Sequence, residues 1–193
     1  MKRWLIASAM LAALGAALFG LLYKPFPAAD TAEGAYMRLA RSIAEGQLET
    51  AFAYLEDDAR DACYTVHSTR KEASALVAEA FPEPERSEVL ARYKADADAK
   101  DGAAVFAREA NERGWVTRLK KDLSGVVEVQ SDGDRATIIT ARGTRYTFRH
   151  TREGSYGLTM FTAELVAQGN RAARDLDVVR KAAVDYGRNK PPH

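Results

Sequence analysis

An uncharged run of 19 residues near the amino terminus constrains this chain more than any other feature. It extends from Leu5 to Tyr23 and follows a basic tip that contains Lys2 and Arg3. A helix of this length, at about 1.5 Å per residue, nearly spans a hydrocarbon core of about 30 Å. We therefore expect residues 1–23 to be a signal-anchor or a signal peptide, with residues 5–23 in the membrane.

The charges around this run predict how the chain crosses the membrane. Lys2, Arg3 and the amino terminus favour a cytoplasmic tail, which places the rest of the chain on the outer side, periplasmic or extracellular. The segment Ala13-Leu14-Gly15 has small residues where a signal peptidase prefers them, but only a short apolar run precedes it. We expect a retained anchor, and secretion after cleavage is the alternative.

The remainder of the chain has the length of one domain. Pro25 and Pro27 favour an extended linker over residues 24–30. Residues 31–187 are enough for a single core, and we expect one α+β domain there. The end of the chain, residues 188–193, contains two prolines and is predicted to be a flexible tail.

Helical spacing of apolar residues fills the first half of the domain, and strand alternation follows it. The first helix is predicted to begin at Asp30 as its N-cap and to end at Gly46. Short turns between the strands favour a four-stranded antiparallel meander, which a final helix follows. The predicted helices are 48–55, 58–81, 85–99, 103–113, a short one from Trp115 that ends before Gly125, and 164–186, and the predicted strands are 126–129, 135–141, 144–150 and 156–161.

Two segments resemble nuclear transport factor two-like domains, which have a cystatin-like α+β fold. Residues 34–55, GAYMRLARSIAEGQLETAFAYL, are similar to the paired opening helices of these domains, and residues 132–161 are similar to their closing hairpins. The resemblance implies a curved sheet over helices, and bacterial envelope proteins of this class carry a similar leader. It also implies a cavity, which in some members is the site of an isomerase or hydratase. The opening helices also resemble one tetratricopeptide unit, with Gly46 at its turn, but a single unit cannot stack into a solenoid, so we rank this resemblance lower.

Composition and motifs exclude several classes of activity. Lys and Arg number 28 against 27 Asp and Glu, so the chain lacks the basic excess of a nucleic-acid-binding protein. Cys63 and His67 share a helical spacing that would suit a metal pair, but no third ligand is evident. The acids from Glu56 to Asp61 lack the glycine and the closing glutamate of a calcium loop. We therefore expect no cofactor, no metal and no catalytic residue, and interpret Cys63 as a buried small apolar residue.

The distribution of charge along the chain is uneven. Residues 134–152 contain five arginines and one acid, whereas residues 31–61 contain seven acids and three arginines. Arg145 and Arg149 should project from one strand face, opposite Tyr146 and Phe148. We predict that Arg135, Arg145 and Arg149 form a surface for an anionic envelope component or an acidic protein partner. A solvated face, or internal pairing of these arginines with the acidic helices, is the alternative.

These observations lead to one expected function and two alternatives. We expect a membrane-anchored or exported envelope domain that binds a partner or ligand without catalysis. The first alternative is a small-molecule cavity of the transport-factor type, with isomerase or hydratase activity. The second is a scaffold or assembly subunit built on the helical half.

Overall fold

The computed structural model describes residues 26–188. The predicted leader over residues 1–23, the first part of the linker and residues 189–193 of the predicted tail lie outside this range. Within residues 26–188, no helix combines the length and the apolar character that a membrane crossing requires. The membrane segment therefore stays a prediction from the sequence.

The α+β class, the meander and the final helix are confirmed. Residues 26–188 form seven helices and a four-stranded antiparallel sheet whose strand order is β1-β2-β3-β4. The elements are α2 (Ala32–Glu45), α3 (Leu48–Phe52), α4 (Asp57–Ala80), α5 (Glu85–Ala97), α6 (Gly102–Glu112), α7 (Trp115–Asp122), β1 (Val126–Asp132), β2 (Arg135–Thr140), β3 (Arg145–His150), β4 (Tyr156–Leu158) and α8 (Thr162–Arg188).

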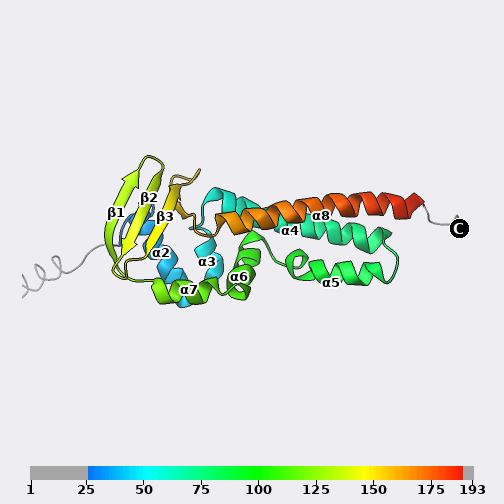
Figure 1. The fold of residues 1–193 in the computed structure, drawn as a ribbon, viewed down its shortest axis with the longest axis horizontal. Coiled ribbons are helices and arrows are strands. Elements are labelled where there is room, and N and C mark those ends of the chain that lie inside the picture. Colours follow the sequence, from blue (N-terminus) through cyan, green and yellow to red (C-terminus); the bar gives the residue numbers. More distant parts are fainter. Residues whose placement is uncertain (1–25, 189–193) are drawn as a thin grey trace, which may run out of the picture.

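The described part of the chain is elongated (Figure 1). The sheet and α2 lie at one end, and α4, α5 and α8 extend to the other end, where α8 finishes. A large buried cluster joins the sheet to α2, α3, α6 and α7. A second, smaller cluster joins the distal parts of α4, α5 and α8, and consists of Ala73, Val77, Phe81, Tyr93, Leu176 and Val179.

One face of the sheet is buried against α2. The register places Ala136 opposite Phe148 and Ile138 opposite Tyr146, and all four side chains are buried. The ring of Tyr36 on α2 lies 5.5 Å from that of Tyr146 and 6.5 Å from that of Phe148, measured between centroids. The alternation predicted for β3 is therefore confirmed, since its aromatic residues point to the core.

The outer strands differ in length from their predicted ranges. Strand β4 stops at Leu158, whereas the prediction continued to Phe161. Leu158 forms a parallel bridge with Leu55, and Thr162 N–H then donates to the carbonyl of Thr159 in a turn that leads into α8. Strand β1 is longer than predicted, because its pairing with β2 continues to the tight turn at Gly133.

The predicted C-terminal end of α2 is correct, and its predicted N-cap is wrong. Gly46 terminates the helix with a φ of 76°, a conformation that glycine adopts without strain. The N-cap, however, is Thr31 and not Asp30, because the Thr31 hydroxyl accepts the N–H of Gly34 at 3.0 Å. Threonine and aspartate are both good N-caps, so the sequence alone did not show which of these two adjacent residues caps the helix.

The helical half is built on α4. Helix α8 runs along α4 in the same direction, and α5 returns beside α4 (Figure 1). Gly169 on α8 lies so close to α4 that an added Cβ would be 3.3 Å from the carbonyl oxygen of Ala62. The ion pairs Arg70–Asp175 and Arg180–Glu72 connect the same two helices further along, and fix their register.

Candidate anion-binding surface

The three arginines of the predicted surface lie on the face of the sheet that α2 does not cover. Arg135 on β2 is opposite Arg149 on β3, and Arg145 is opposite Ile139. Arg135 and Arg145 are exposed, whereas the side chain of Arg149 is 35% exposed. The three side chains therefore share a face as predicted, but their surroundings differ.

Arg149 forms ion pairs within the protein. Its Nη1 lies 3.1 Å from Oε2 of Glu56, a side chain that is only 5% exposed, and its Nε lies 3.8 Å from Oδ2 of Asp134. The contact with Glu56 is close, but its angles are not those of a hydrogen bond. Gly157 makes this approach possible, because the backbone of Glu56 crosses directly above it and leaves no room for a Cβ. Arg149 thus neutralises a buried acid, and this is the internal pairing that the sequence left open.

Carboxylates at the start of α4 likewise pair with arginines, and these pairs bind the β3–β4 hairpin to the helix. Asp57 accepts the backbone N–H of Arg152 at 2.8 Å and pairs with Arg60 at 2.6 Å, and Arg152 also reaches Asp61 at 2.8 Å. We call Asp57, Arg60, Asp61 and Arg152 the hairpin clamp. Burial raises the pKa of Asp57, but its bonds to Arg152 and Arg60 outweigh burial, so this pKa lies below its usual value. Asp57 and Asp61 therefore bind arginines of the hairpin and of α4.

Five other cations lie on α7 and at the β2–β3 turn, two segments that meet where Arg142 contacts Lys121. All five are exposed, and none pairs with a carboxylate within residues 26–188. Asp122 is the one acid in residues 115–125 and 140–146, which contain them. We call this group the cationic end, and it consists of Arg118, Lys120, Lys121, Arg142 and Arg145.

Hydrogen bonds hold the two segments of the cationic end together. The guanidinium of Arg142 donates to the carbonyl of Lys121, and the backbone N–H of Arg142 donates to Oγ of Ser124 at 3.1 Å. The hydroxyl of Tyr36 donates to the carbonyl of Ser124 at 2.7 Å and ties this junction to α2. Lys120 and Lys121 occupy the last turn of α7, where the helix dipole favours positive charge.

The inner face of the sheet is filled by side chains. Tyr36, Ile138, Tyr146 and Phe148 are each no more than 2% exposed, and burial raises the pKa of Tyr146 to about 12. A shallow notch of about 260 Å³ lies elsewhere, between α4 and α8. Its lining consists of Asp58, Asp61, Ala62, Thr65, Val166, Gly169 and Asn170.

Cys63 and His67 lie on α4 without forming a reactive couple. Cys63 is 1% exposed, which confirms its interpretation as a buried apolar residue. Burial, and then the carboxylates of Glu109 and Asp96, raise the pKa of its thiol to about 12. His67 lies against the backbone, with Nδ1 3.3 Å from the carbonyl of Asp96. Residues 26–188 contain no group of three or more histidine, cysteine, aspartate or glutamate side chains placed to hold a metal ion.

Sequence reasoning missed the three cations of α7. Their signal was present in the run Arg118-Leu119-Lys120-Lys121, a basic helix end with one buried residue. Nothing in that run showed that the end of α7 lies beside Arg142, since this contact depends on how α7 packs against the sheet.

Comparisons of the chain with protein-family models, with curated proteins and with solved structures gave no match. The resemblance to nuclear transport factor two-like domains therefore stays a prediction.

Proposed function

We propose that this protein is a membrane-anchored or exported envelope domain that binds an anionic partner and catalyses no reaction. The main support for the proposal is the cationic end, whose two contacting segments hold five exposed cations without carboxylate partners among the described residues. Exposed charges of one sign raise the local concentration of oppositely charged partners and steer their approach.

The proposal changes which arginines are expected to bind. Arg145 stays in the surface, since its guanidinium donates only to the neutral side chain of Gln130, at 2.9 Å. Arg135 also stays in the surface, since its side chain is exposed on the same face of the sheet. Arg149 is left out, because releasing it would leave Glu56 buried and unpaired.

The packing of the inner sheet face argues against the transport-factor alternative. A cavity of that type needs an open concave face with an inward Asp, His or Tyr. Here Tyr36, Tyr146 and Phe148 occupy the space between the sheet and α2, and burial raises the pKa of both tyrosines above the ordinary value. Neither hydroxyl is therefore suited to take up a proton near neutral pH.

Binding to a soluble polyanion tests the proposed function. Full-length protein in a neutral detergent is titrated with fluorescent inorganic polyphosphate at low salt. We expect binding that weakens steeply with added salt and is lost when Arg142 and Arg145 are both changed to Glu. The matched control changes Arg171 and Arg174, two exposed residues of α8, to Glu. Absence of binding, or equal loss in both variants, contradicts the cationic end as the binding surface.

A scaffold role on the helical half is the second candidate, because α8 exposes two apolar side chains. Val178 is 66% exposed and Val184 is 53% exposed, although α4 covers the opposite side of α8. Light scattering on the full-length protein in detergent tests this role. A larger mass that Val178→Lys with Val184→Lys reduces to the monomer supports it, and a monomeric wild type contradicts it.

A further inference from the structure

The chain enters the domain at a fixed point. The guanidinium of Arg38 on α2 donates to the carbonyl of Pro27 at 2.8 Å and lies 4.7 Å from the ring centre of Phe26. The hydroxyl of Thr31 donates to the carbonyl of Ala28 at 2.8 Å, and that carbonyl occupies the space where a Cβ of Gly34 would be. The described part of the predicted linker, residues 26–30, thus lies against α2.

This fixed entry point restricts the reach of the domain from a membrane. Two residues lie between Tyr23, the end of the uncharged run, and Phe26, and the three steps along the chain span at most about 11 Å. The Debye length at physiological ionic strength is about 8 Å, so charges that come within this distance of the headgroups act on them with little screening. If residues 5–23 insert, the entry point is held next to the headgroups.

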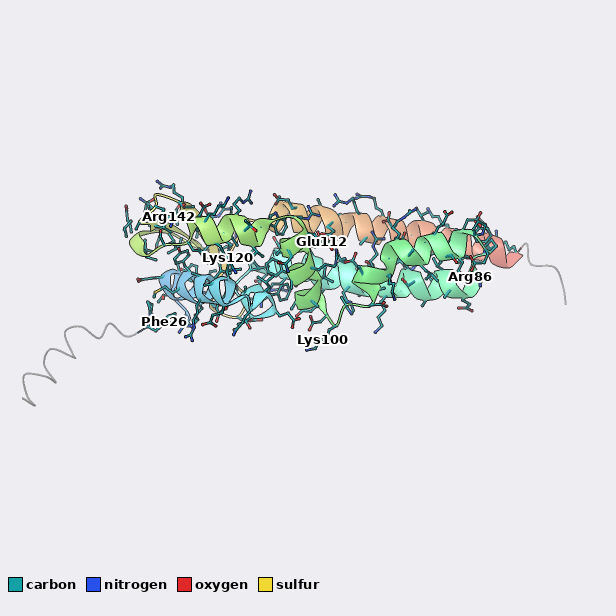
Figure 2. All side chains as sticks on the ribbon, turned by 90° about the horizontal axis from the view of Figure 1, so that it is seen from below. Phe26, Arg86, Lys100, Glu112, Lys120 and Arg142 are labelled. Atoms are coloured by element: carbon teal, nitrogen blue, oxygen red, sulfur yellow. The ribbon has the colours of Figure 1, made fainter. Side chains whose placement is uncertain are left out.

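The cationic end lies at the same end of the molecule as this entry point. Figure 2 shows Phe26 and Arg142 at one end of the long axis, with Lys120 close to them and Arg86 toward the other end. Phe26 is 45% exposed, and aromatic rings are favoured at the level of the headgroups. Arg142 and Lys120 of the cationic end therefore lie at the same end of the molecule as Phe26, where the described chain enters the domain.

We propose that the cationic end docks on the anionic lipid headgroups of the membrane that holds the leader. This proposal rests on the proposed function and names its partner. The tether favours lipid over a soluble anion, because it makes docking intramolecular and presents headgroups at high effective concentration. In the docked state Lys120, Lys121 and Arg142 contact phosphates, and α4, α5 and α8 extend away from the bilayer.

Energy transfer in vesicles tests the docking. Full-length protein is reconstituted with an acceptor-labelled lipid, either in phosphatidylcholine alone or in phosphatidylcholine with phosphatidylglycerol. A donor is placed on Ala141→Cys, in the β2–β3 turn, or on Val184→Cys, near the end of α8. Labelling is selective because Cys63 is buried. We expect more transfer from position 141 in the anionic vesicles, no such gain from position 184, and reversal at high salt.

Removal of charge tests which residues act. Each cation near an anionic surface changes the docked-to-undocked ratio about fivefold, so changing Lys120, Lys121 and Arg142 to Gln should lower it roughly 100-fold. Changing three exposed α8 cations, Arg171, Arg174 and Lys181, to Gln removes the same charge and should leave transfer unchanged. The salt series uses the labelled Ala141→Cys protein with all cations of the cationic end intact, so it stays informative even if a charge variant misfolds.

The outcomes separate the two proposals. Equal transfer from position 141 in neutral and anionic vesicles overturns lipid docking. If polyphosphate still binds in detergent, the proposed function stands and its partner is a soluble or polymeric anion. If polyphosphate binding is absent as well, both proposals fail. Equal losses in the two triple variants would overturn the assignment to the cationic end.

Discussion

Replacing Arg149 by Leu should destabilise the protein much more than the same change at Arg145. The change leaves Glu56, whose side chain is 5% exposed, without the cation that lies 3.1 Å away. Breaking a buried ion pair on one side costs about 3–5 kcal/mol. Arg149 is itself 35% exposed and its contact with Glu56 is not aligned as a hydrogen bond, so water can replace part of it. We expect a loss of about 2 kcal/mol, which lowers Tm by roughly 6 °C.

Thermal and urea unfolding of the full-length protein in neutral detergent measure this loss. Arg145→Leu is the matched control, since its guanidinium contacts only Gln130, and it should change stability by less than about 0.5 kcal/mol. The double variant with Glu56→Leu should recover at least about 1 kcal/mol relative to the sum of the single changes. Equal stability of Arg149→Leu and Arg145→Leu would refute the assignment of Arg149 to the interior.

Three further predictions follow from the same contacts. The thiol of Cys63, with a pKa of about 12, should react with a thiol reagent at pH 8 about 1,000-fold more slowly in the native protein than after unfolding, and rapid native labelling would contradict its burial. The pKa of Asp57 is lower in the folded state than in the unfolded chain, so the hairpin clamp stabilises the fold at pH values above the unfolded-state pKa, and this stabilisation is lost as the pH falls through the folded-state pKa. The difference in stability between wild type and Asp57→Asn should therefore disappear below about pH 4. A difference that persists there would count against the clamp. Gly34→Ala should free residues 26–30 from α2 and speed amide exchange at Thr31, whereas Gly187→Ala, at a site with open space, should not; identical exchange in both variants would show that the linker is not packed.

Local chemistry made most of the helix and strand positions predictable. Gly46 ends α2 in a left-handed conformation that favours glycine, and α4 ends just before Pro82 because proline has no N–H with which to continue a helix. The alternation around Tyr146 and Phe148 identified the buried face of β3, because strand residues point to opposite faces in turn.

Contacts between distant segments could not be predicted in the same way. The pairing of Arg149 with Glu56 joins residues 93 positions apart, and it depends on the close passage of Glu56 over Gly157. The sequence showed an excess of arginine in one segment and of acid in another, but not which arginines would meet an acid. The cationic end depends in turn on the position of α7, which Tyr36 fixes through Ser124.

The topology of the intact chain tests the central claim most directly. Full-length Val184→Cys is expressed in bacterial cells, which are treated with a membrane-impermeant thiol reagent before and after lysis, and Cys63 contributes little background because it is buried. We predict that position 184 is labelled from outside once the outer barrier is permeabilised, and that the chain stays in the membrane fraction at alkaline pH. Labelling only after lysis, with the intact chain dissolved in the cytosol, would contradict the account.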